Sequence, residues 1–286
     1  MRAQAKRSED NSRSRPITLE QALSALAKDR SADGEAFERA LGESLSSLRR
    51  ELARVGRPKA RVGLADSPTL GRLLVALSDQ GVAMVCYVER AGDLHQAILR
   101  LARKFDLFGD ERAAAAVAAE LTRYSVGETD QLTYAVDLSL VEGDFSRRAL
   151  LALKTLWRGA AVTYQGLAAA IGARQKARAV GYAMNLNPVP IFVPCHRVLA
   201  SDLSLHGYAG GLARKALLLR AEGFELASRP LKLAGELVWA NREAKIFCRP
   251  SCPSARRADR ARMVFFAGAD AASRAGMRPC RICRPA

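Results

Sequence analysis

The sequence of 286 residues lacks any apolar run long enough to cross a lipid bilayer, which takes about 20 residues. Its first fifteen residues are polar and charged, without the apolar core segment of a secretory signal. These two absences argue against a membrane-spanning helix and against export. We therefore expect a soluble protein of the cytoplasm with no membrane partner.

Acidic residues are scarce in two parts of the chain. Residues 147–220 hold eleven Lys/Arg and a single acid, Asp202, and residues 229–286 hold thirteen Lys/Arg and four acids. The net charge of +16 is therefore concentrated in two blocks, whereas residues 16–146 carry sixteen Lys/Arg against twenty acids. Such basic blocks indicate a polyanion partner, because lysine and arginine contacts to phosphates dominate nucleic-acid affinity. A general preference for arginine on solvated faces is the alternative.

The six cysteines are distributed unevenly, and four lie in the last 39 residues. Cys248 and Cys252 have three residues between them, and Cys280 and Cys283 have two. Both spacings suit tetrahedral zinc ligation by thiolates, and without an export signal disulfides are not expected. A segment this short can hardly bury a core, so we expect Zn²⁺ to supply its folding energy. Cys86 lies in an apolar strand pattern and is expected to be a buried structural thiol.

The first half of the chain carries no catalytic motif. Residues 1–15 are predicted to be a disordered basic tail, and residues 16–58 a helical segment of unknown role. Residues 59–145 are predicted to form a small α/β domain. Its expected elements are strands at 61–65 and 82–88, an apolar run at 70–77, helices at 94–105 and 112–121, and a strand at 130–141.

Residues 146–226 are expected to be helical with turns. Ser146 is the predicted cap of a first helix that reaches Trp157, and Thr163 of a second helix over 164–171. A turn at Gly172 leads into a basic helix over 175–184, which is typical of a helix-turn-helix. A last helix is predicted over 212–222, and the cysteine-rich domain spans 229–286.

A cysteine and a histidine are adjacent in the run Pro194-Cys195-His196-Arg197-Val198. Cysteine attacks carbon as a thiolate, which His196 could generate as a base if both side chains turn the same way. Glu222 is a candidate to orient the imidazole. The alternative is a buried thiol beside a surface histidine.

The wider context of this motif resembles the active-site domain of the O6-alkylguanine-DNA alkyltransferases, over residues from about 150 to 223. Besides 194–198, the matching segments are Thr163-Tyr164-Gln165-Gly166-Leu167-Ala168, Arg178-Ala179-Val180-Gly181, Asn185-x-Asn187-Pro188, Tyr208-Ala209-Gly210-Gly211 and Lys215. The resemblance implies an α+β multidomain protein. Its expected parts are a ribonuclease-H-like α/β domain (59–145), an all-α active-site domain with the helix-turn-helix (146–226), and a small zinc-bound α+β domain (229–286).

The resemblance also implies a role for each matching residue. Cys195 would accept the alkyl group, His196 would take the thiol proton through a water, and Glu222 would orient His196. Tyr208 and Lys215 would polarise the departing guanine, and Asn185 would order the turn before the active-site segment. The remaining implied residues contact DNA: Arg178, which fills the gap left by a flipped nucleotide, Tyr164, Gly181 and Arg197.

The implied partner is alkylated double-stranded DNA, bound through its minor groove by a monomeric protein associated with the nucleoid. No organic cofactor is expected. The implied reaction is a single-turnover repair of O6-alkylguanine, and less readily of O4-alkylthymine. The alternatives are a zinc-dependent DNA-binding regulator, a lesion sensor that recruits other repair proteins and, more remotely, a papain-like protease.

The cysteine-rich tail resembles the Ada-type metal-binding domain. The matching segments are Cys248-Arg249-Pro250-Ser251-Cys252, Phe265-Phe266 and Gly276-Met277-Arg278-Pro279-Cys280-Arg281-Ile282-Cys283. This resemblance implies that zinc-held Cys248 accepts a methyl group from a methylphosphotriester, since zinc keeps a thiolate deprotonated. A purely structural Cys₄ zinc site is the alternative.

Overall fold

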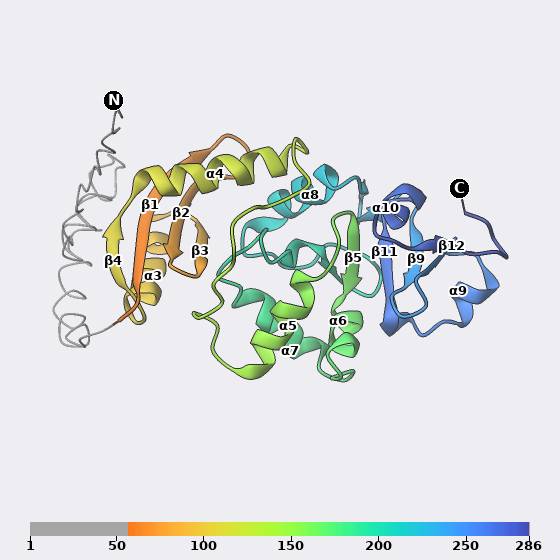
Figure 1. Cartoon of the computed structure of the whole chain (residues 1–286). Coiled ribbons are helices and arrows are strands. Elements are labelled where there is room, and N and C mark those ends of the chain that lie inside the picture. Colours follow the sequence, from red (N-terminus) through yellow and green to blue (C-terminus); the bar gives the residue numbers. More distant parts are fainter. Residues whose placement is uncertain (1–56, 286) are drawn as a thin grey trace, which may run out of the picture.

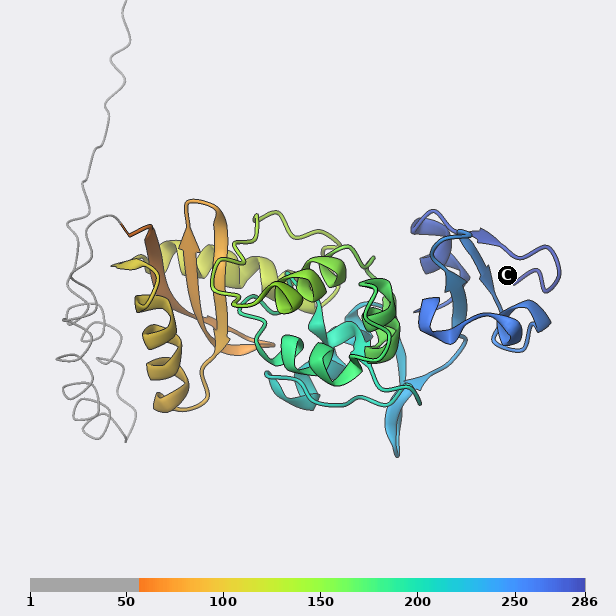
Figure 2. The ribbon, with the colours of Figure 1, turned by 90° about the horizontal axis from the view of Figure 1, so that it is seen from below.

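The computed structural model describes residues 57–285, which form an α+β fold (Figure 1). The expected tail at 1–15 and nearly all of the expected helical segment at 16–58 lie outside the described residues. Within 57–285, no helix combines the length and apolarity that a membrane span requires. Figure 2 shows the chain running from a four-stranded sheet, through a largely helical middle, to the cysteine-rich end.

The four-stranded sheet forms because apolar residues alternate along its strands. The order is β3-β2-β1-β4, with β1, β2 and β3 antiparallel and β4 parallel to β1. In β2, Leu73 and Val75 join one apolar cluster, and Leu74 and Ala76 join another. Both faces of the sheet are therefore buried. The strands are β1 (Lys59–Ser67), β2 (Gly71–Ser78), β3 (Gly81–Tyr87) and β4 (Asp106–Gly109).

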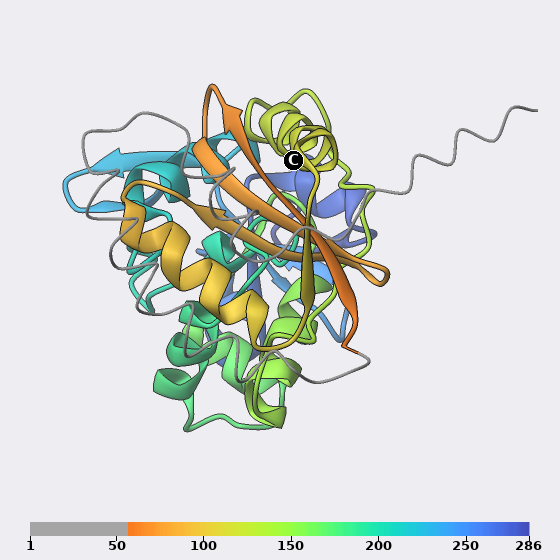
Figure 3. The same cartoon turned by 90° about the vertical axis from the view of Figure 1, so that its left-hand side faces the viewer.

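One helix covers each face of this sheet. Helix α3 (Ala91–Ala102) packs on the Leu74 face, and it crosses in front of the strands in Figure 3. Helix α4 (Glu111–Ser125) lies on the other face, and Asp110 caps it by accepting a hydrogen bond from Ala113 N at 2.9 Å. It approaches the sheet closely, because a Cβ at Gly63 would lie 2.7 Å from the Asp110 carbonyl oxygen.

The prediction of a strand at 130–141 is wrong. This segment touches β3 through a single bridge between Val82 and Val136 and otherwise runs as a loop. Asp137 ends the contact, since its carboxylate accepts hydrogen bonds from the Ser78 hydroxyl at 2.6 Å and from Ser139 N at 2.7 Å. Side chain–backbone bonds of this kind compete with strand pairing.

The helices of the middle unit follow the sequence prediction closely. Thr163 caps α6 by accepting a hydrogen bond from Gly166 N at 3.0 Å, as predicted. The predicted cap at Ser146 is wrong, because Gly143 is the cap and Ser146 lies buried within α5. The helices are α5 (Asp144–Lys154), α6 (Tyr164–Ala170), α7 (Ala177–Asn185) and α8 (Gly211–Ala221).

The middle unit is not all-α, which corrects the prediction. A six-stranded sheet of order β12-β10-β9-β11-β5-β6 crosses from the cysteine-rich segment into it, as Figure 1 shows for β11 and β5. The strands are β5 (Ala160–Thr163), β6 (Val198–Leu199), β9 (Val238–Asn241), β10 (Ile246–Cys248), β11 (Met263–Phe266) and β12 (Arg278–Pro279). The short run Ala160–Thr163 is fully buried and β-branched at its end, so it also suits a strand.

A hairpin of β7 (Glu225–Ser228) and β8 (Leu231–Ala234) spans the end of one predicted domain and the start of the next. Two short helices, α9 (Pro253–Arg257) and α10 (Ala269–Arg274), complete the cysteine-rich unit.

Candidate active site and metal centre

Cys195 opens a short 3₁₀ turn (Cys195–Arg197), and 6% of its surface is exposed. Its main side-chain partner is Asn187, whose Nδ2 donates to Sγ at 3.1 Å and to the Val193 carbonyl oxygen at 2.9 Å. Asn187 also accepts a hydrogen bond from Val189 N at 3.1 Å. This buried amide therefore fixes the loop that carries the cysteine.

Asn185, which we expected to order this turn, does not do so. It is the last residue of α7 and its side chain is exposed. Asn187 takes the role because it lies just past the helix end, where the chain turns inward. Sequence reasoning missed this residue although it stands in the same matched segment.

The surroundings of the Cys195 thiol shift its pKa in opposite directions. Burial raises its pKa, whereas the Asn187 hydrogen bond and the positive charge of Lys215 lower it. Lys215 is fully buried and its Nζ donates to the carbonyl oxygens of Val198 at 2.7 Å and His206 at 2.6 Å. Burial lowers the pKa of Lys215 to about 8. A thiol in this setting needs a base to become a nucleophile.

His196 is placed to be that base. It is fully buried, and its Nε2 lies 2.6 Å from Oε1 of Glu222, so the predicted pair is brought together. Burial raises the pKa of Glu222, but Arg197 and His196 outweigh it and hold that pKa well below its usual range. The carboxylate therefore accepts a hydrogen bond from Nε2–H, which leaves Nδ1 as the basic nitrogen. Nδ1 is buried without a hydrogen-bond partner among the described residues, and burial lowers the pKa of His196.

Arg197 lies in the interior, which corrects its expected role in DNA binding. It is 5% exposed, and its guanidinium donates to Glu222 Oε2 at 2.9 Å and to the Tyr124 hydroxyl oxygen at 2.7 Å. Tyr124 in turn donates to Glu222 Oε1 at 2.7 Å. The arginine is directed inward, so it neutralises the buried carboxylate.

Tyr208 packs against the buried apolar cluster that includes Cys195. Its hydroxyl lies 2.8 Å from that of Tyr87, a residue of the N-terminal sheet that sequence reasoning did not identify. Burial raises the pKa of Tyr208 well above its usual value, and Tyr87 and Cys195 add to this effect. Both phenols therefore stay protonated at neutral pH. The apolar pattern at the end of β3 gave no signal that Tyr87 would contact Tyr208.

The two helices α6 and α7 are joined by a tight turn at Gly172, whose φ is +74°. Arg178 is exposed on α7, and Tyr164, at the start of α6, is half-buried. Tyr164 packs against the buried apolar cluster that includes Cys195, and burial and that cysteine raise the pKa of Tyr164. A Cβ at Gly181 would meet Tyr164 Cε1 at 3.8 Å, an ordinary contact, so the protein itself does not demand glycine there.

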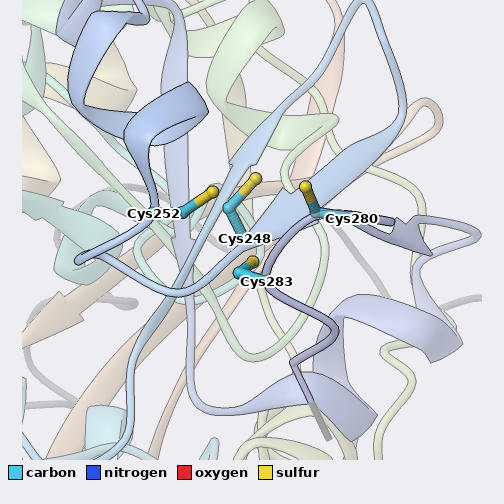
Figure 4. A group of neighbouring side chains, drawn as sticks. All are labelled: Cys248, Cys252, Cys280 and Cys283. Carbon is cyan, nitrogen blue, oxygen red and sulfur yellow. The ribbon is translucent and has the colours of Figure 1, made fainter.

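The four C-terminal cysteines converge on one point, as Figure 4 shows. Their Sγ atoms all lie within 4.8 Å of one another. Zn–S bonds of about 2.3 Å in a tetrahedron require sulfur atoms at such separations, so the four thiols fit a zinc ion. Burial and the neighbouring cysteines raise the pKa of Cys248, because nearby thiolates repel one another, and a dication would remove that repulsion. The backbone amides of Cys283 and Ile282 lower the pKa of Cys280 to about 7.

The two cysteine centres belong to one sheet. Phe265 and Phe266 of β11 pair with Ala161 and Ala160 of β5, and β5 pairs with β6, which directly follows the Cys195 turn. On the other side, β11 pairs with β9, and β9 with the strand β10 that ends at Cys248. A salt bridge of 2.6 Å between Arg174 and Asp259 adds a second link between the units.

Two family models match the chain. Residues 144–224 match the DNA binding domain of 6-O-methylguanine DNA methyltransferase, and residues 225–286 match the metal binding domain of Ada. The methylated-DNA–protein-cysteine methyltransferase of Mycobacterium bovis is 41% identical over 113 residues, which are 40% of this chain and 67% of that protein. The protein of the same name from Mycolicibacterium paratuberculosis is 42% identical over 111 residues, 39% of this chain and 66% of that protein.

The bifunctional transcriptional activator/DNA repair enzyme Ada of Escherichia coli is 34% identical over 193 residues, 66% of this chain and 53% of that protein. The chain thus matches about two thirds of the mycobacterial relatives and about half of Ada. Among solved structures, that of Mycobacterium tuberculosis OGT in complex with DNA aligns with a TM-score of 0.46 and 33% identity, over 57% of this chain and 92% of that chain.

Proposed function

Because this chain belongs to the methylated-DNA–protein-cysteine methyltransferase family, we propose that it repairs DNA by transferring alkyl groups from O6-alkylguanine, and less readily O4-alkylthymine, to Cys195. The observation that carries the proposal is the buried relay beside the thiol: His196 bonded to Glu222 at 2.6 Å, with its Nδ1 free of protein partners in the described structure. A relay of this kind serves to deprotonate a neighbouring nucleophile.

The proposed transfer is a displacement at the alkyl carbon. The thiol proton of Cys195 passes through a water to Nδ1 of His196, and the sulfur attacks the carbon bound to guanine O6. The S–C bond forms as the C–O bond breaks, and the electron pair of that bond remains on the guanine. A proton donated from the side of Tyr208 and Lys215 lets the guanine leave as a neutral base, while the carboxylate of Glu222 stabilises the His196 cation. Among the residues that the structure describes, no group in the site would remove a thioether, so we expect each thiol to act once.

The buried position of Cys195 requires the target base to leave the duplex, at a cost of a few kcal/mol. We propose that Arg178, exposed on α7, fills the gap in the stack, and that Tyr164 assists from the start of α6. The ordinary contact made by a Cβ at Gly181 supports a glycine selected for close approach to DNA. The helix pair would enter the minor groove, where recognition depends little on sequence.

Intact-mass spectrometry after reaction with a duplex that carries one O6-methylguanine tests this function. We expect the mass of the protein to rise by one methylene, on the peptide that contains Cys195. The variant Cys195→Ala should gain no mass from this DNA. Binding to alkylated DNA without any gain in mass would instead favour a lesion sensor that recruits other repair proteins.

We propose a second acceptor at Cys248, which would take a methyl group from a methylphosphotriester. Support comes from the four-sulfur cluster that fits zinc and from the exposed basic residues around it, such as Arg249 and Arg281. A bound zinc ion keeps a cysteine deprotonated and nucleophilic at neutral pH. With methylphosphotriester DNA, Cys195→Ala should still gain one methylene, and Cys195→Ala with Cys248→Ala none. No gain in either protein would leave the cluster a structural zinc site.

The remaining finer expectations are part of the same proposal. The strand order β3-β2-β1-β4, with β4 alone parallel, supports a ribonuclease-H-like N-terminal domain. The protein would act as a monomer on the nucleoid in the cytoplasm. A zinc-dependent regulator is the alternative, and sequence-selective promoter binding that increases after methylation would support it.

A further inference from the structure

Strand β3 ends at Tyr87, and this tyrosine contacts Tyr208 of the middle unit. Its hydroxyl oxygen lies 2.8 Å from that of Tyr208, and the two ring centroids are 6.1 Å apart. Tyr87 is 8% exposed. Tyr87 and Cys195 belong to the same buried apolar cluster. Burial above all, and Cys195 in addition, raise the pKa of Tyr87. The N-terminal sheet thus contributes a side chain that contacts Tyr208 beside the cluster that includes Cys195.

The rings of Tyr87 and Tyr208 both pack closely against the backbone at Gly210. A Cβ at Gly210 would lie 2.5 Å from Cε2 of Tyr87 and 2.8 Å from Cε1 of Tyr208. Such separations are far below van der Waals contact, so any side chain at Gly210 would push both rings away. Packing against Gly210 therefore fixes the positions of both tyrosine rings.

Arg214 also holds Tyr87 in place, through a contact with the face of its ring. Its guanidinium carbon lies 4.7 Å from the centroid of the Tyr87 ring, within the range of a cation–π interaction. Its Nε donates to the Leu70 carbonyl oxygen at 2.7 Å, and its Nη1 donates to the Gly210 carbonyl oxygen at 3.0 Å. One arginine of α8 thus ties the β1–β2 turn, the Tyr87 ring and the Tyr208 loop together. A cation over the ring also makes the phenol a stronger hydrogen-bond donor.

The direction of the hydrogen bond decides what the pair can do. Both phenols are protonated, so the pair holds two hydroxyl hydrogens and uses one of them internally. The Tyr87 hydroxyl bonds only to Tyr208 within the described residues. When Tyr87 donates, the hydrogen of Tyr208 remains free for another acceptor. If Tyr208 donated to Tyr87 instead, its only hydroxyl hydrogen would be used in that bond, and Tyr208 could only accept a hydrogen bond from the base.

We propose that Tyr87 is a positioning residue that donates its hydroxyl hydrogen to Tyr208 and so directs the Tyr208 hydrogen toward the extruded base. The proposal rests on the alkyl transfer proposed above. No proton passes between Tyr87 and Tyr208 in this arrangement. Chains of hydrogen bonds polarise one another, so a donor bonded to Tyr208 oxygen strengthens the bond that Tyr208 gives to the departing guanine. Through Tyr87, the N-terminal domain would then affect the rate of alkyl transfer, in addition to packing against the middle unit.

A double-mutant cycle tests the proposal on the full-length zinc-bound protein. Single-turnover methyl transfer from an O6-methylguanine duplex, at saturating protein, is measured for the wild type, Tyr87→Phe, Tyr208→Phe and the double variant. We expect Tyr87→Phe to slow the transfer step by about three- to tenfold, the worth of one hydrogen bond, with an unchanged Kd for the duplex. The double variant should be no slower than Tyr208→Phe, because Tyr87 acts through Tyr208.

Tyr134→Phe is the matched control, because Tyr134 also belongs to the N-terminal part, packs on Phe192, and makes no side-chain hydrogen bond among the described residues. It should transfer at the wild-type rate. An unchanged rate in Tyr87→Phe, or equal slowing in the presence and absence of the Tyr208 hydroxyl, overturns the inference. Absence of transfer by the wild type would overturn the proposed function itself, and the inference with it.

If Tyr87→Phe does not fold, a ring-fluorinated tyrosine at position 87 decides the question. Fluorine makes the phenol more acidic and a stronger donor while keeping the hydroxyl and the ring. We expect the transfer rate to rise when Tyr208 is present and to stay constant in Tyr208→Phe. A rate that is insensitive to fluorination in both backgrounds overturns the inference.

Discussion

The hydroxyl of Tyr124, on α4 of the N-terminal domain, donates to Oε1 of Glu222 at 2.7 Å, although 98 residues separate the two in the sequence. Burial raises the pKa of this phenol, and the carboxylate of Glu222 adds to the effect, so Tyr124 remains a donor at any physiological pH. The same carboxylate orients His196. The N-terminal domain therefore supports the relay directly, through the group on which the histidine depends.

Tyr124→Phe removes this bond and keeps the ring. We expect the free energy of unfolding to fall by about 1–3 kcal/mol, because a buried carboxylate and the Nη2 of Arg197 each lose a partner. Transfer at Cys195 should also slow, since His196 is held less firmly. Urea denaturation and single-turnover kinetics measure the two effects. A variant as stable as Tyr134→Phe would show that the bond contributes nothing.

Asn187→Ala and Asn185→Ala form a matched pair two residues apart. Asn187 donates to Sγ of Cys195 at 3.1 Å and lowers the thiol pKa, so its removal should raise that pKa further. The alkylation rate of Cys195 by iodoacetamide, followed against pH, should therefore shift its midpoint upward in Asn187→Ala alone. Asn185 is exposed at the helix end, and its replacement should leave the midpoint and the stability unchanged. A larger shift in Asn185→Ala would contradict the assignment.

Local signals in the sequence were sufficient for the thiol, its histidine and the four cysteines. Cys195 and His196 are adjacent, the cysteine pairs have ligand spacing, and Thr163 caps the helix it precedes. Glu222 was only a candidate on the residues alone, since 26 residues separate it from His196, and the resemblance supported the choice. The structure brings these groups together as expected.

Long-range packing between distant segments left no such signal. Tyr87 and Tyr124 occupy ordinary apolar positions of a strand and a helix. Only the packing of the N-terminal sheet and α4 on the middle unit brings them to Tyr208 and Glu222. The pairing of β5 with β11 joins residues about a hundred positions apart, and short strands in a helical region have too few residues to show a period. Arg197 could not be told from a surface arginine, because its burial depends on the carboxylate it neutralises.

Lys215 predicts two opposite trends with pH. Its folded pKa of about 8 lies below the usual lysine value of 10.5, so between these values the unfolded chain holds a proton that the folded chain has released. Stability should therefore rise across this window relative to Lys215→Met, because the unfolded state binds more protons. The transfer rate should fall above about pH 8 in the wild type, since the cation that lowers the thiol pKa disappears.

Thermal melts and single-turnover rates, measured from neutral pH up to the usual lysine pKa of 10.5, follow the two trends as differences between the wild type and Lys215→Met. The variant should be slower throughout and should lack the alkaline decline. A stability difference that stays flat over the window would show that Lys215 is charged in the folded protein.

Metal removal should affect the middle unit as well as the cysteine-rich unit. The sheet that carries Cys248 continues through β11 into β5, and Arg174 bonds Asp259 across the same boundary. A ligand that binds only the folded state stabilises every part of the protein that unfolds together with the binding site. We therefore expect a chelator, or Cys252→Ser, to lower the unfolding temperature of the entire described part in calorimetry.

Cys86→Ser is the control for this experiment, because Cys86 lies in β3, away from the four-cysteine cluster. It should keep the metal content and respond to the chelator as the wild type does. Two separate transitions, of which only one shifts on chelation, would mean that the shared sheet does not couple the units.

Replacement of Arg178 should weaken DNA binding, whereas replacement of Arg197 should lower the stability of the fold. Arg178 is exposed on α7, so Arg178→Ala should weaken binding to undamaged and alkylated duplexes and leave the melting temperature unchanged. Arg197 is buried in a pair of bonds to Glu222 at 2.9 and 3.1 Å, and lysine cannot reproduce that geometry. Arg197→Lys keeps the positive charge but leaves buried hydrogen-bond partners unsatisfied, so it should lower the free energy of unfolding by about 1–3 kcal/mol.

Salt dependence separates the two roles, because removing one phosphate-binding side chain reduces the slope of log Kd against log salt by about one. Titrations of a duplex at several salt concentrations should give Arg197→Lys the wild-type slope, at temperatures where it remains folded. A reduced slope in Arg197→Lys would mean that the guanidinium leaves the interior when DNA binds. A wild-type affinity in Arg178→Ala would mean that α7 does not face the duplex.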